Sequence, residues 1–406
     1  MMDEFFSKCL NLNQLREHDL CVCGTSLTAC ALIKYLQKNG CRIRWWVGKA
    51  FEGIQSQRLQ LYGVRICAAS QVAEITSEVS YCLIACEHTR EAKHYIEKLS
   101  SLLPLLEIQN KQEAHVDISG RCQLRCPSCQ VANHAPGSLQ YGTRGMMEPE
   151  LFRDIIGKLK ADYPNLLSVC LFNYGEPLLS PYLAEYIRYV HDMGLLCVVS
   201  SNLSVKCDLF PILDAGPDVL KISVSGYRQE IYETTHVGGD IELVLYQMQR
   251  VREILDELSK KNDILTMVGY HLYNNNDQDD FLSMQSLCEA LGFLFQPIDA
   301  LFCNIPKLIG YDQMGDKDVA FIRKYYREPD RILKSKNSGN SGMRCSNEVN
   351  RVYIDYDGRV MLCCLVLHKD GLFRNYLDVT AAEINAWKRS NPICLCCKQA
   401  GMAVKD

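Results

Sequence analysis

Three closely spaced cysteines are the residues of this chain best suited to chemistry. Cys122, Cys126 and Cys129 form a C-x3-C-x2-C run. The run follows residues 115–119, whose alternating apolar and polar side chains predict a short strand that Gly120 ends. Three thiolates on a loop can hold an iron–sulfur cluster, but a cluster that takes four ligands keeps one iron open. The spacing therefore predicts a cluster with one iron available to a cosubstrate.

This cysteine run, placed directly after a strand, resembles the signature of the radical S-adenosylmethionine (radical SAM) superfamily. The resemblance implies a [4Fe–4S] cluster with the amino and carboxylate groups of S-adenosylmethionine (SAM) on the fourth iron. It also implies reductive cleavage of SAM to a 5′-deoxyadenosyl radical, which abstracts hydrogen from a substrate. The sequence departs from the family pattern at Ser128, where an aromatic residue is common. Three unrelated buried cysteines, or an incomplete zinc site, are the alternatives.

Polar residues follow the next predicted strands, and the family resemblance gives them roles at a SAM pocket. Residues 173–177 read Asn-Tyr-Gly-Glu-Pro and resemble the Gly-Gly-Glu motif, with Tyr174 in place of the first glycine. Glu176 would accept hydrogen bonds from the SAM ammonium, and Gly175 would let the backbone approach the ligand. A solvent-facing glutamate in a turn is the alternative. The residues expected at this pocket are Tyr174, Gly175, Glu176, Ser200, Asn202, Ser223 and Ser225.

Four cysteines near the C-terminus predict a second site that has no open position. Residues 352–355 and 360–362 read as two strands around an Asp-Gly turn at 357–358, which predicts a hairpin. One cysteine follows the hairpin, and a C-x2-C pair comes later in what we expect to be a terminal loop. A structural zinc ribbon would use the same ligands. The expected ligands are Cys345, Cys363, Cys394 and Cys397.

The order Cys, Gly-x4-Cys, C-x2-C resembles the SPASM and twitch extensions of radical SAM enzymes. No cysteine follows Cys397, so the resemblance implies the shorter twitch form with one auxiliary [4Fe–4S] cluster. Cys364 and Cys396 neighbour the expected ligands and are alternatives to them. We favour iron–sulfur over zinc because the first cysteine motif is present.

Composition limits the classes of partner. The chain has 406 residues, 48% of them hydrophobic, which suggests two or three domains with large cores. A net charge of −4 offers no basic field for nucleic acid, and no apolar run has the length of a membrane span. The start of the chain lacks the pattern of a secretory signal. We therefore expect a cytoplasmic protein whose 22 cysteines are thiols or metal ligands.

The first 108 residues alternate strand and helix patterns. Strands are expected at 20–23, 43–47, 64–67 and 81–85, with a helical stretch after the first, third and fourth. This alternation predicts a Rossmann-like α/β domain over residues 1–108. Gly24 stands without the other glycines of a dinucleotide fingerprint, and no acidic residue ends the second strand. We therefore expect a docking or substrate-holding domain rather than an NAD site.

Residues 109–300 contain the strand patterns of a second α/β domain. The six strands are expected at 115–119, 167–173, 196–200, 219–225, 264–271 and 293–298. The family resemblance implies that they form a partial TIM barrel, (β/α)6, with the active site at the C-terminal strand ends. Residues 301–342 are expected to be an irregular linker, exposed at 334–342, and residues 343–406 to form the SPASM/twitch-type domain.

The expected function is hydrogen abstraction from a small substrate. The C-terminal cysteine order resembles that of radical SAM aminocyclitol dehydrogenases, which implies a carbohydrate or aminocyclitol-type substrate and dehydrogenation, dehydration or epimerisation. A radical SAM peptide maturase is one alternative, and a non-catalytic iron–sulfur electron carrier or zinc-stabilised scaffold is another. The expected partner is a reductant such as flavodoxin or ferredoxin, with neither nucleic acid nor membrane. Candidates for the catalytic acid or base are Arg144, His236, Asp240, Tyr270 and His271.

Overall fold

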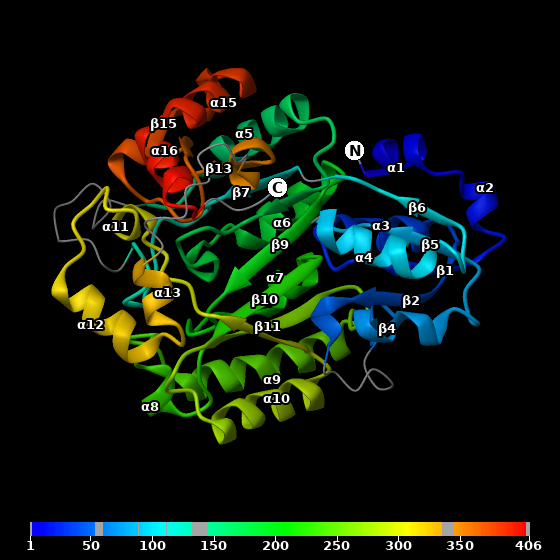
Figure 1. Cartoon of the computed structure of the whole chain (residues 1–406), viewed down its shortest axis with the longest axis horizontal. Helices are drawn as coiled ribbons and strands as arrows, with labels where there is room; N and C mark the ends of the chain where they lie inside the picture. The colour runs from blue at the N-terminus through cyan, green and yellow to red at the C-terminus, as the bar shows by residue number, and fades with distance from the viewer. Residues whose placement is uncertain are drawn as a thin grey trace.

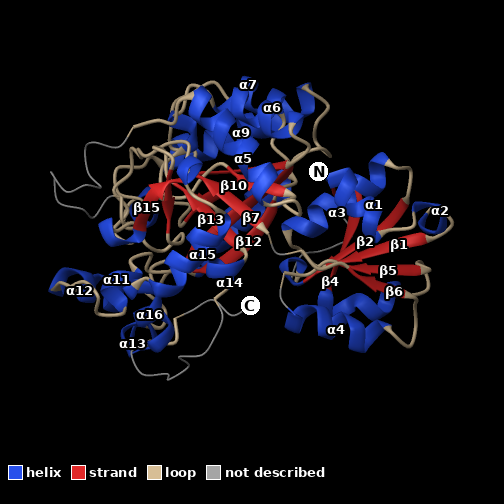
Figure 2. Ribbon diagram, turned by 90° about the horizontal axis from the view of Figure 1, so that it is seen from above, coloured by secondary structure: helices blue, strands red, loops and turns tan. Residues whose placement is uncertain are grey.

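The computed structural model describes residues 2–52, 60–87, 89–110, 112–131, 145–334 and 345–402. It contains two sheets, each flanked by helices, which lie side by side along the long axis of the molecule (Figures 1 and 2). None of the described helices is long and apolar enough to cross a bilayer.

The first sheet belongs to the N-terminal part of the chain and has the strand order β3-β4-β2-β1-β5-β6. All pairs are parallel except β3 with β4. The strands are β1 Asp19–Cys23, β2 Arg42–Gly48, β3 Gln60–Leu61, β4 Val64–Ala68, β5 Tyr81–Ile84 and β6 Leu105–Glu107. The helices are α1 Met2–Cys9, α2 Leu12–Leu15, α3 Leu27–Lys38 and α4 Thr89–Leu99. The four expected strands are confirmed, and the parallel strands β4-β2-β1-β5-β6 follow the 3-2-1-4-5 order of a Rossmann-like sheet.

The second sheet has nine strands in the order β12-β11-β10-β9-β8-β7-β13-β14-β15. The six strands expected for the barrel are confirmed, and every pair from β12 to β7 is parallel. These strands are β7 Glu113–Val116, β8 Ser168–Cys170, β9 Leu196–Ser201, β10 Val219–Val224, β11 Leu265–Leu272 and β12 Leu294–Asp299. The fold class is therefore α/β, as expected, with the six parallel strands of a partial barrel.

Helices cover the outer face of these six strands. They are α5 Pro149–Asp162, α6 Leu183–Asp192, α7 Phe210–Ala215, α8 Gln229–Tyr232, α9 Ile241–Glu257 and α10 Gln278–Leu291. Alternate strand residues such as Val169, Ile222 and Val268 pack against them in the largest core cluster. Because side chains alternate across a strand, the intervening residues face the barrel interior.

The expected linker is helical where it is described, so that prediction was wrong. Residues 301–334 contain α11 Ile305–Leu308, α12 Asp316–Tyr325 and α13 Pro329–Lys334. Ile322 and Tyr326 are buried with Ile393 in a core of their own, and this tertiary packing stabilises helices whose sequence pattern is weak. The loop expected at 334–342 lies outside the described residues after Lys334.

The C-terminal hairpin is confirmed, and its place in the fold is a new finding. Strands β13 Arg351–Ile354 and β14 Arg359–Met361 pair antiparallel, and Gly358 in their turn has a φ of +84°. β13 also pairs in parallel with β7, so the hairpin extends the barrel sheet, which ends at β15 Leu372–Asn375. The remaining helices are α14 Ser346–Val349, α15 Ala381–Ser390 and α16 Pro392–Gln399.

The terminal loop expected around the C-x2-C pair is instead helix α16. The Asn391 side chain caps this helix by accepting a hydrogen bond from the Ile393 backbone, and Pro392 occupies its first turn. Cys394 and Cys397 are three residues apart and therefore lie on one face of the helix.

The N-terminal sheet packs on one end of the barrel. Buried residues of this sheet and its helices, including Trp46 and Phe51, share one apolar cluster with Val198, Val219 and Leu265. These three barrel residues point inward near the starts of their strands. The N-terminal domain therefore fills the barrel interior at the N-terminal strand ends and leaves the opposite ends for a site.

Candidate active site

The loop that carries the first cysteine run is held by hydrogen bonds from two other segments. The Asn202 amide, just after β9, donates to Cys122 Sγ at 3.7 Å and accepts from the Gln123 side chain at 2.7 Å. The Arg125 backbone N–H donates to Val237 O at 2.9 Å, from the segment before α9. The three thiols are thus presented at the C-terminal ends of the barrel strands.

The three thiols are close enough to influence one another. Burial, with a contribution from Glu176, raises the pKa of Cys122 to about 12. Burial also raises the pKa of Cys126 well above its usual value, and Cys129 and Cys122 raise it further. Thiolates gathered in this way need a metal charge to be stable. A metal cluster fits this donor set, and Cys122, Cys126 and Cys129 would hold it.

The segment 173–177 packs directly on the start of the cysteine loop. Asp117, fully buried, accepts hydrogen bonds from the backbone N–H groups of Tyr174 and Gly175 at 3.1 and 3.2 Å. A Cβ on Gly175 would lie 1.5 Å from the carbonyl oxygen of Ser119. Gly175 is therefore required for contact with the chain itself, a reason that differs from the approach to a ligand expected from the sequence.

Glu176 is buried and most of its hydrogen-bonding capacity is used within the chain. Its carboxylate accepts from Ser201 Oγ at 2.7 Å, from the Asn202 backbone at 2.9 Å and from the Leu178 backbone at 3.0 Å. Burial raises the pKa of Glu176 against the opposing effect of these donors. A carboxylate has about four acceptor positions, so one remains for a ligand ammonium. The alternative of a solvent-facing glutamate is excluded by its 2% exposure.

The serines expected at the SAM pocket divide into two groups. Ser200 and Ser223 lie on β9 and β10 with their hydroxyl oxygens 3.5 Å apart. Ser225 is buried at the end of β10, and its hydroxyl contacts His236 Nδ1 at 2.6 Å and Thr235. Ser200 and Ser223 thus belong to the barrel interior, whereas Ser225 orients a histidine.

The five candidates for the acid or base are not equivalent. The rings of His236 and His271 lie 6.4 Å apart, nearly parallel, and burial lowers their pKa values to about 3 and about 4.

The other candidates have different places. Asp240 caps α9 by accepting hydrogen bonds from the N–H groups of Glu242 and Leu243. Tyr270 donates a hydrogen bond to Asp280 on the helix-covered face. Arg144 lies outside the described residues. His236 and His271 are therefore the candidates that the fold brings to the interior.

The four C-terminal cysteines come together around one small apolar cavity. Cys345, Cys363, Cys394 and Cys397 line it with Ile305, Leu362 and Ile393, among others. Cys345 raises the pKa of both Cys394 and Cys397, after the larger effect of burial, which shows that their thiols are neighbours. This donor set, four thiols in an apolar enclosure, fits a metal site with all-cysteine ligation.

Cys364 and Cys396 do not line this cavity. Cys364 has the Asn347 amide 4.0 Å from its sulfur and a hydrogen bond with Tyr353. The side chains of consecutive residues point in different directions, which separates Cys364 from Cys363 and Cys396 from Cys397.

Two residues near both cysteine sites were missed by sequence reasoning. Gln130 is buried, follows Cys129 and donates through its amide to Tyr174 Oη at 3.0 Å and to Leu365 O at 2.9 Å. Cys303 lies between the sites: burial raises its pKa to about 12, and Cys129 and Cys364 contribute. No spacing rule links these residues to the cysteine motifs, because they meet them only through tertiary structure.

Two further features lie outside this site. Cys21 and Cys23 of β1 and Cys82 of β5 are fully buried, with neighbouring sulfurs 3.5 Å apart. They behave as small apolar side chains of a core.

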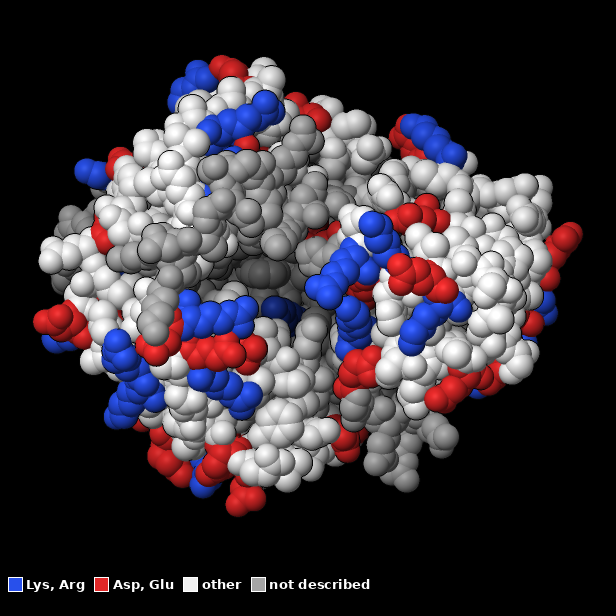
Figure 3. Space-filling view, in the orientation of Figure 1, with Lys and Arg blue, Asp and Glu red and all other residues white. Residues whose placement is uncertain are grey.

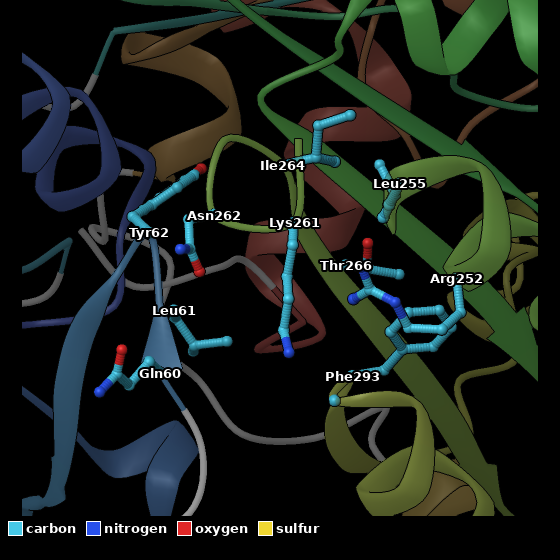
Figure 4. Close-up of a pocket in the computed structure, with 11 residues that line it drawn as sticks. Gln60, Leu61, Tyr62, Arg252, Leu255, Lys261, Asn262, Ile264, Thr266 and Phe293 are labelled. Atoms are coloured by element: carbon cyan, nitrogen blue, oxygen red, sulfur yellow. The ribbon is translucent and has the colours of Figure 1, made fainter. Parts of the chain in front are cut away.

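A cavity of ≈ 240 Å³ lies between the N-terminal sheet and the barrel (Figure 4). Its lining includes Lys261 and Thr266 at the start of β11, at the end of the barrel opposite to the cysteine loops.

Comparison with known proteins identifies the barrel segment. Residues 116–284 match the family model "Radical SAM superfamily". An AdoMet-dependent heme synthase of Oleidesulfovibrio alaskensis is 28% identical over 185 residues, which are 43% of this chain and 42% of that protein. This chain therefore covers less than half of the length of that relative.

Solved structures of low sequence identity overlap with most of the chain. One is Streptococcus suis SuiB bound to its precursor peptide SuiA, at 14% identity and a TM-score of 0.48, covering 75% of this chain and 70% of that one. Another is BtrN in complex with AdoMet and 2-DOIA, at 13% identity and a TM-score of 0.41, covering 73% and 89%. The match to the family model, together with the three thiols at the strand ends, shows that this chain carries a radical SAM domain over residues 116–284.

Proposed function

We propose that this protein is a radical SAM enzyme that oxidises a small carbohydrate or aminocyclitol-type substrate, with an auxiliary [4Fe–4S] cluster held by Cys345, Cys363, Cys394 and Cys397. Dehydration and epimerisation begin from the same hydrogen abstraction. When bound at the first three cysteines, the cluster and SAM supply the 5′-deoxyadenosyl radical. The chain itself positions the ligands, excludes water and provides the proton acceptor, for which we propose His236 or His271 because burial keeps both imidazoles neutral.

The observation that carries this proposal is the closeness of the two cysteine sites. Cys129 and Cys363 pack against one small apolar cluster, formed by Tyr174, Tyr353, Met361 and Leu367. A substrate radical that loses a proton in a net oxidation must also give up an electron. The arrangement offers a second cluster beside the first as the acceptor, which supports oxidation over a redox-neutral reaction.

The spread of the C-terminal thiols supports iron–sulfur over zinc. A tetrahedral zinc site with Zn–S bonds of about 2.3 Å holds its sulfurs about 3.8 Å apart. Among the described residues, the one group of three potential ligands that lie within 4.8 Å of one another is Cys21, Cys23 and Cys82. No three thiols of the C-terminal site are therefore that close together, which suits ligation of a larger inorganic cluster better than a zinc shell.

The closed end of the barrel supports a small substrate. Apolar residues of the N-terminal domain, such as Trp46, share a cluster with the inward-facing Val198 and Val219 near the strand starts. The interior is then entered from the cysteine-loop end, where a small polar molecule can be enclosed.

The test is the double variant Cys394→Ala with Cys397→Ala in anaerobically reconstituted enzyme. We expect 5′-deoxyadenosine to form still, uncoupled from oxidation, while the oxidised product is lost. Both compounds are measured in the same reaction, and circular dichroism verifies the fold. Cys9→Ala, at an exposed cysteine, is the matched control. Full product formation by the folded double variant, or stoichiometric zinc in the wild-type site, would rule out the electron-transfer role.

A further inference from the structure

The barrel interior contains a lysine whose charge is not balanced by the chain. Lys221 lies on β10, and the residues beside it, Leu220 and Ile222, face the helices in the main core. Lys221 therefore points to the interior, on the same face of the sheet as Ser223. It is partly buried, and its ammonium makes no hydrogen bond or ion pair with any residue in the described ranges.

His271 stands beside this lysine with its ring nitrogens also free of hydrogen bonds within the described part of the chain. It lies on β11, which is hydrogen-bonded to β10 with Ser223 opposite Gly269. Burial and the nearby Lys221 lower the pKa of His271 to about 4, so the imidazole is neutral. The pair thus offers one positive charge and one neutral donor on adjacent strands.

Gly269 gives the lysine room to reach this position. A Cβ on Gly269 would lie 3.2 Å from Lys221 Cε and 3.4 Å from Ile298 Cδ1. The aliphatic part of the Lys221 side chain therefore passes over β11 at Gly269, where the absence of a Cβ leaves space above the backbone. Figure 3 shows a hollow in this face of the molecule with basic side-chain atoms set deep inside it.

An unpaired ammonium inside a protein is costly unless a ligand of opposite charge pairs with it. Among the described residues, the groups that we place around the ammonium are the neutral His271 and the hydroxyls of Ser200 and Ser223, whose oxygens are 3.5 Å apart. Together with the lysine, these groups have a net charge of one. A single carboxylate would balance that charge and accept from these donors, whereas a phosphate dianion would leave one charge uncompensated. An amino group at this position would be repelled.

We propose that Lys221 and His271 bind a carboxylate of the substrate, so that the substrate is a small polyhydroxylated acid rather than an aminocyclitol. This inference rests on the proposed function, because it assigns the substrate class of the same site. It makes Lys221 a specificity-determining residue that touches the substrate and not the radical-generating cluster.

The test uses acetate as the probe and acetamide, its neutral analogue, as the control. The reconstituted enzyme with SAM bound is reductively methylated at its lysines with ¹³C-formaldehyde. The resonance that is missing from the Lys221→Gln and Lys221→Arg enzymes is then followed by NMR. We expect acetate to shift this resonance saturably and acetamide to leave it unmoved. Isothermal titration with acetate compares the unmethylated enzymes, and Lys221→Gln should bind acetate about tenfold or more weakly, the loss expected for one charge-assisted hydrogen bond. Lys261→Gln removes the same charge at an exposed site and should change nothing.

Other outcomes would overturn the proposal. If acetate and acetamide act alike on the Lys221 resonance, no anion site exists. If acetate binds only in the absence of SAM, or if Lys221→Gln weakens SAM binding, the lysine belongs to the cosubstrate carboxylate instead. None of these measurements needs turnover, so they are separate from the product assay that tests the proposed function.

Discussion

The side-chain oxygen of Gln130 accepts a hydrogen bond from the backbone N–H of Leu367 at 2.9 Å, across 237 positions in the sequence. Gln130 immediately follows Cys129, and Leu367 lies four residues after Cys363. The amide nitrogen of the same side chain donates to Leu365 O and Tyr174 Oη. One buried amide therefore fixes the relative position of the two cysteine sites.

Replacing Gln130 with Leu removes these bonds and leaves the buried backbone N–H of Leu367 unpaired, whereas Leu365 O keeps its hydrogen bond from the Ile305 N–H. An unsatisfied buried group costs about 1–3 kcal/mol, so we expect a loss of that size in the free energy of unfolding. Product formation should fall more than SAM cleavage, because the second site is displaced from the first. Urea unfolding and a paired assay of 5′-deoxyadenosine and product measure both effects. Gln109→Leu, at an exposed glutamine, is the control. Equal losses of the two activities would argue against a role in positioning the sites.

Glu176→Ala is expected to weaken SAM binding about tenfold or more, because a charge-assisted hydrogen bond to the ammonium is lost. The structure adds that the carboxylate also holds the Leu178 and Asn202 backbones, so the variant should unfold more easily as well. Isothermal titration with SAM and urea unfolding separate these effects. Glu150→Ala changes an exposed glutamate and should alter neither. A lower stability with unchanged SAM affinity would leave Glu176 a purely structural role.

Most strands of the two sheets could be predicted from the sequence because their apolar runs are short and end at glycines or polar residues. The short edge strands β3, β6 and β15 were not predicted. Helix α12 could not, because it depends on the packing of Ile322 and Tyr326 against Ile393, from a segment far along the chain. The same reason explains why the position of β13 in the sheet was not predicted. Its pairing with β7 is a long-range contact that no local pattern indicates.

The candidate active site likewise contains residues that the sequence pattern identified and residues that only the fold identified. The spacing of Cys122, Cys126 and Cys129 indicated a shared role, whereas the orienting roles of Asp117 and Gln130 required the fold. The reason for Gly175 also differed from expectation: the tight contact is with Ser119 of the chain itself. Sequence patterns thus located residues that share a short segment, and tertiary structure located those that only meet in space.

Asp218 couples the N-terminal domain to the barrel, and its protonation should loosen this contact. Its carboxylate is paired with Lys34 of α3 and with His191 Nε2 at 2.9 Å. Burial acts to raise the pKa of Asp218, but His191 and Lys34 outweigh it and lower the pKa below the usual value of about 3.9. The pKa of Asp218 is lower in the folded state than in the unfolded state. This stabilisation is therefore present above pH 4 and is lost as the pH falls through the folded-state pKa.

Asp218→Asn should therefore cost about 3 kcal/mol near neutral pH, since it leaves the Lys34 charge without its partner. The difference from wild type should stay constant from pH 7 to pH 5 and shrink below pH 4. Urea midpoints at each pH measure it. Asp214→Asn, which alters an exposed ion pair with Arg188, is the control with a small effect. A difference that grows as the pH falls would contradict the assignment of the pKa.

Lys388 is expected to raise the reduction potential of the cluster that we propose at the C-terminal site. Its ammonium is fully buried and donates to Arg351 O at 2.6 Å and to Asn347 O at 3.0 Å. Burial lowers the pKa of Lys388 to about 8, and the nearby thiols of Cys363, Cys394 and Cys345 oppose this lowering. The lysine is therefore a fixed cation beside the four thiols, and it stabilises the more negative, reduced state of a cluster.

Lys388→Met should lower the midpoint potential of this cluster by an amount on the order of tens of millivolts, the effect of one charge within the protein interior. A redox titration followed by electron paramagnetic resonance measures the potential of each cluster separately, without turnover. Lys388→Arg keeps the charge and should restore most of the potential, which separates an electrostatic role from a packing role. Lys369→Met removes an exposed charge and is the matched control. The electrostatic role fails if Met and Arg at position 388 shift the potential equally, because the loss would then reflect altered packing around Asn347 and Arg351.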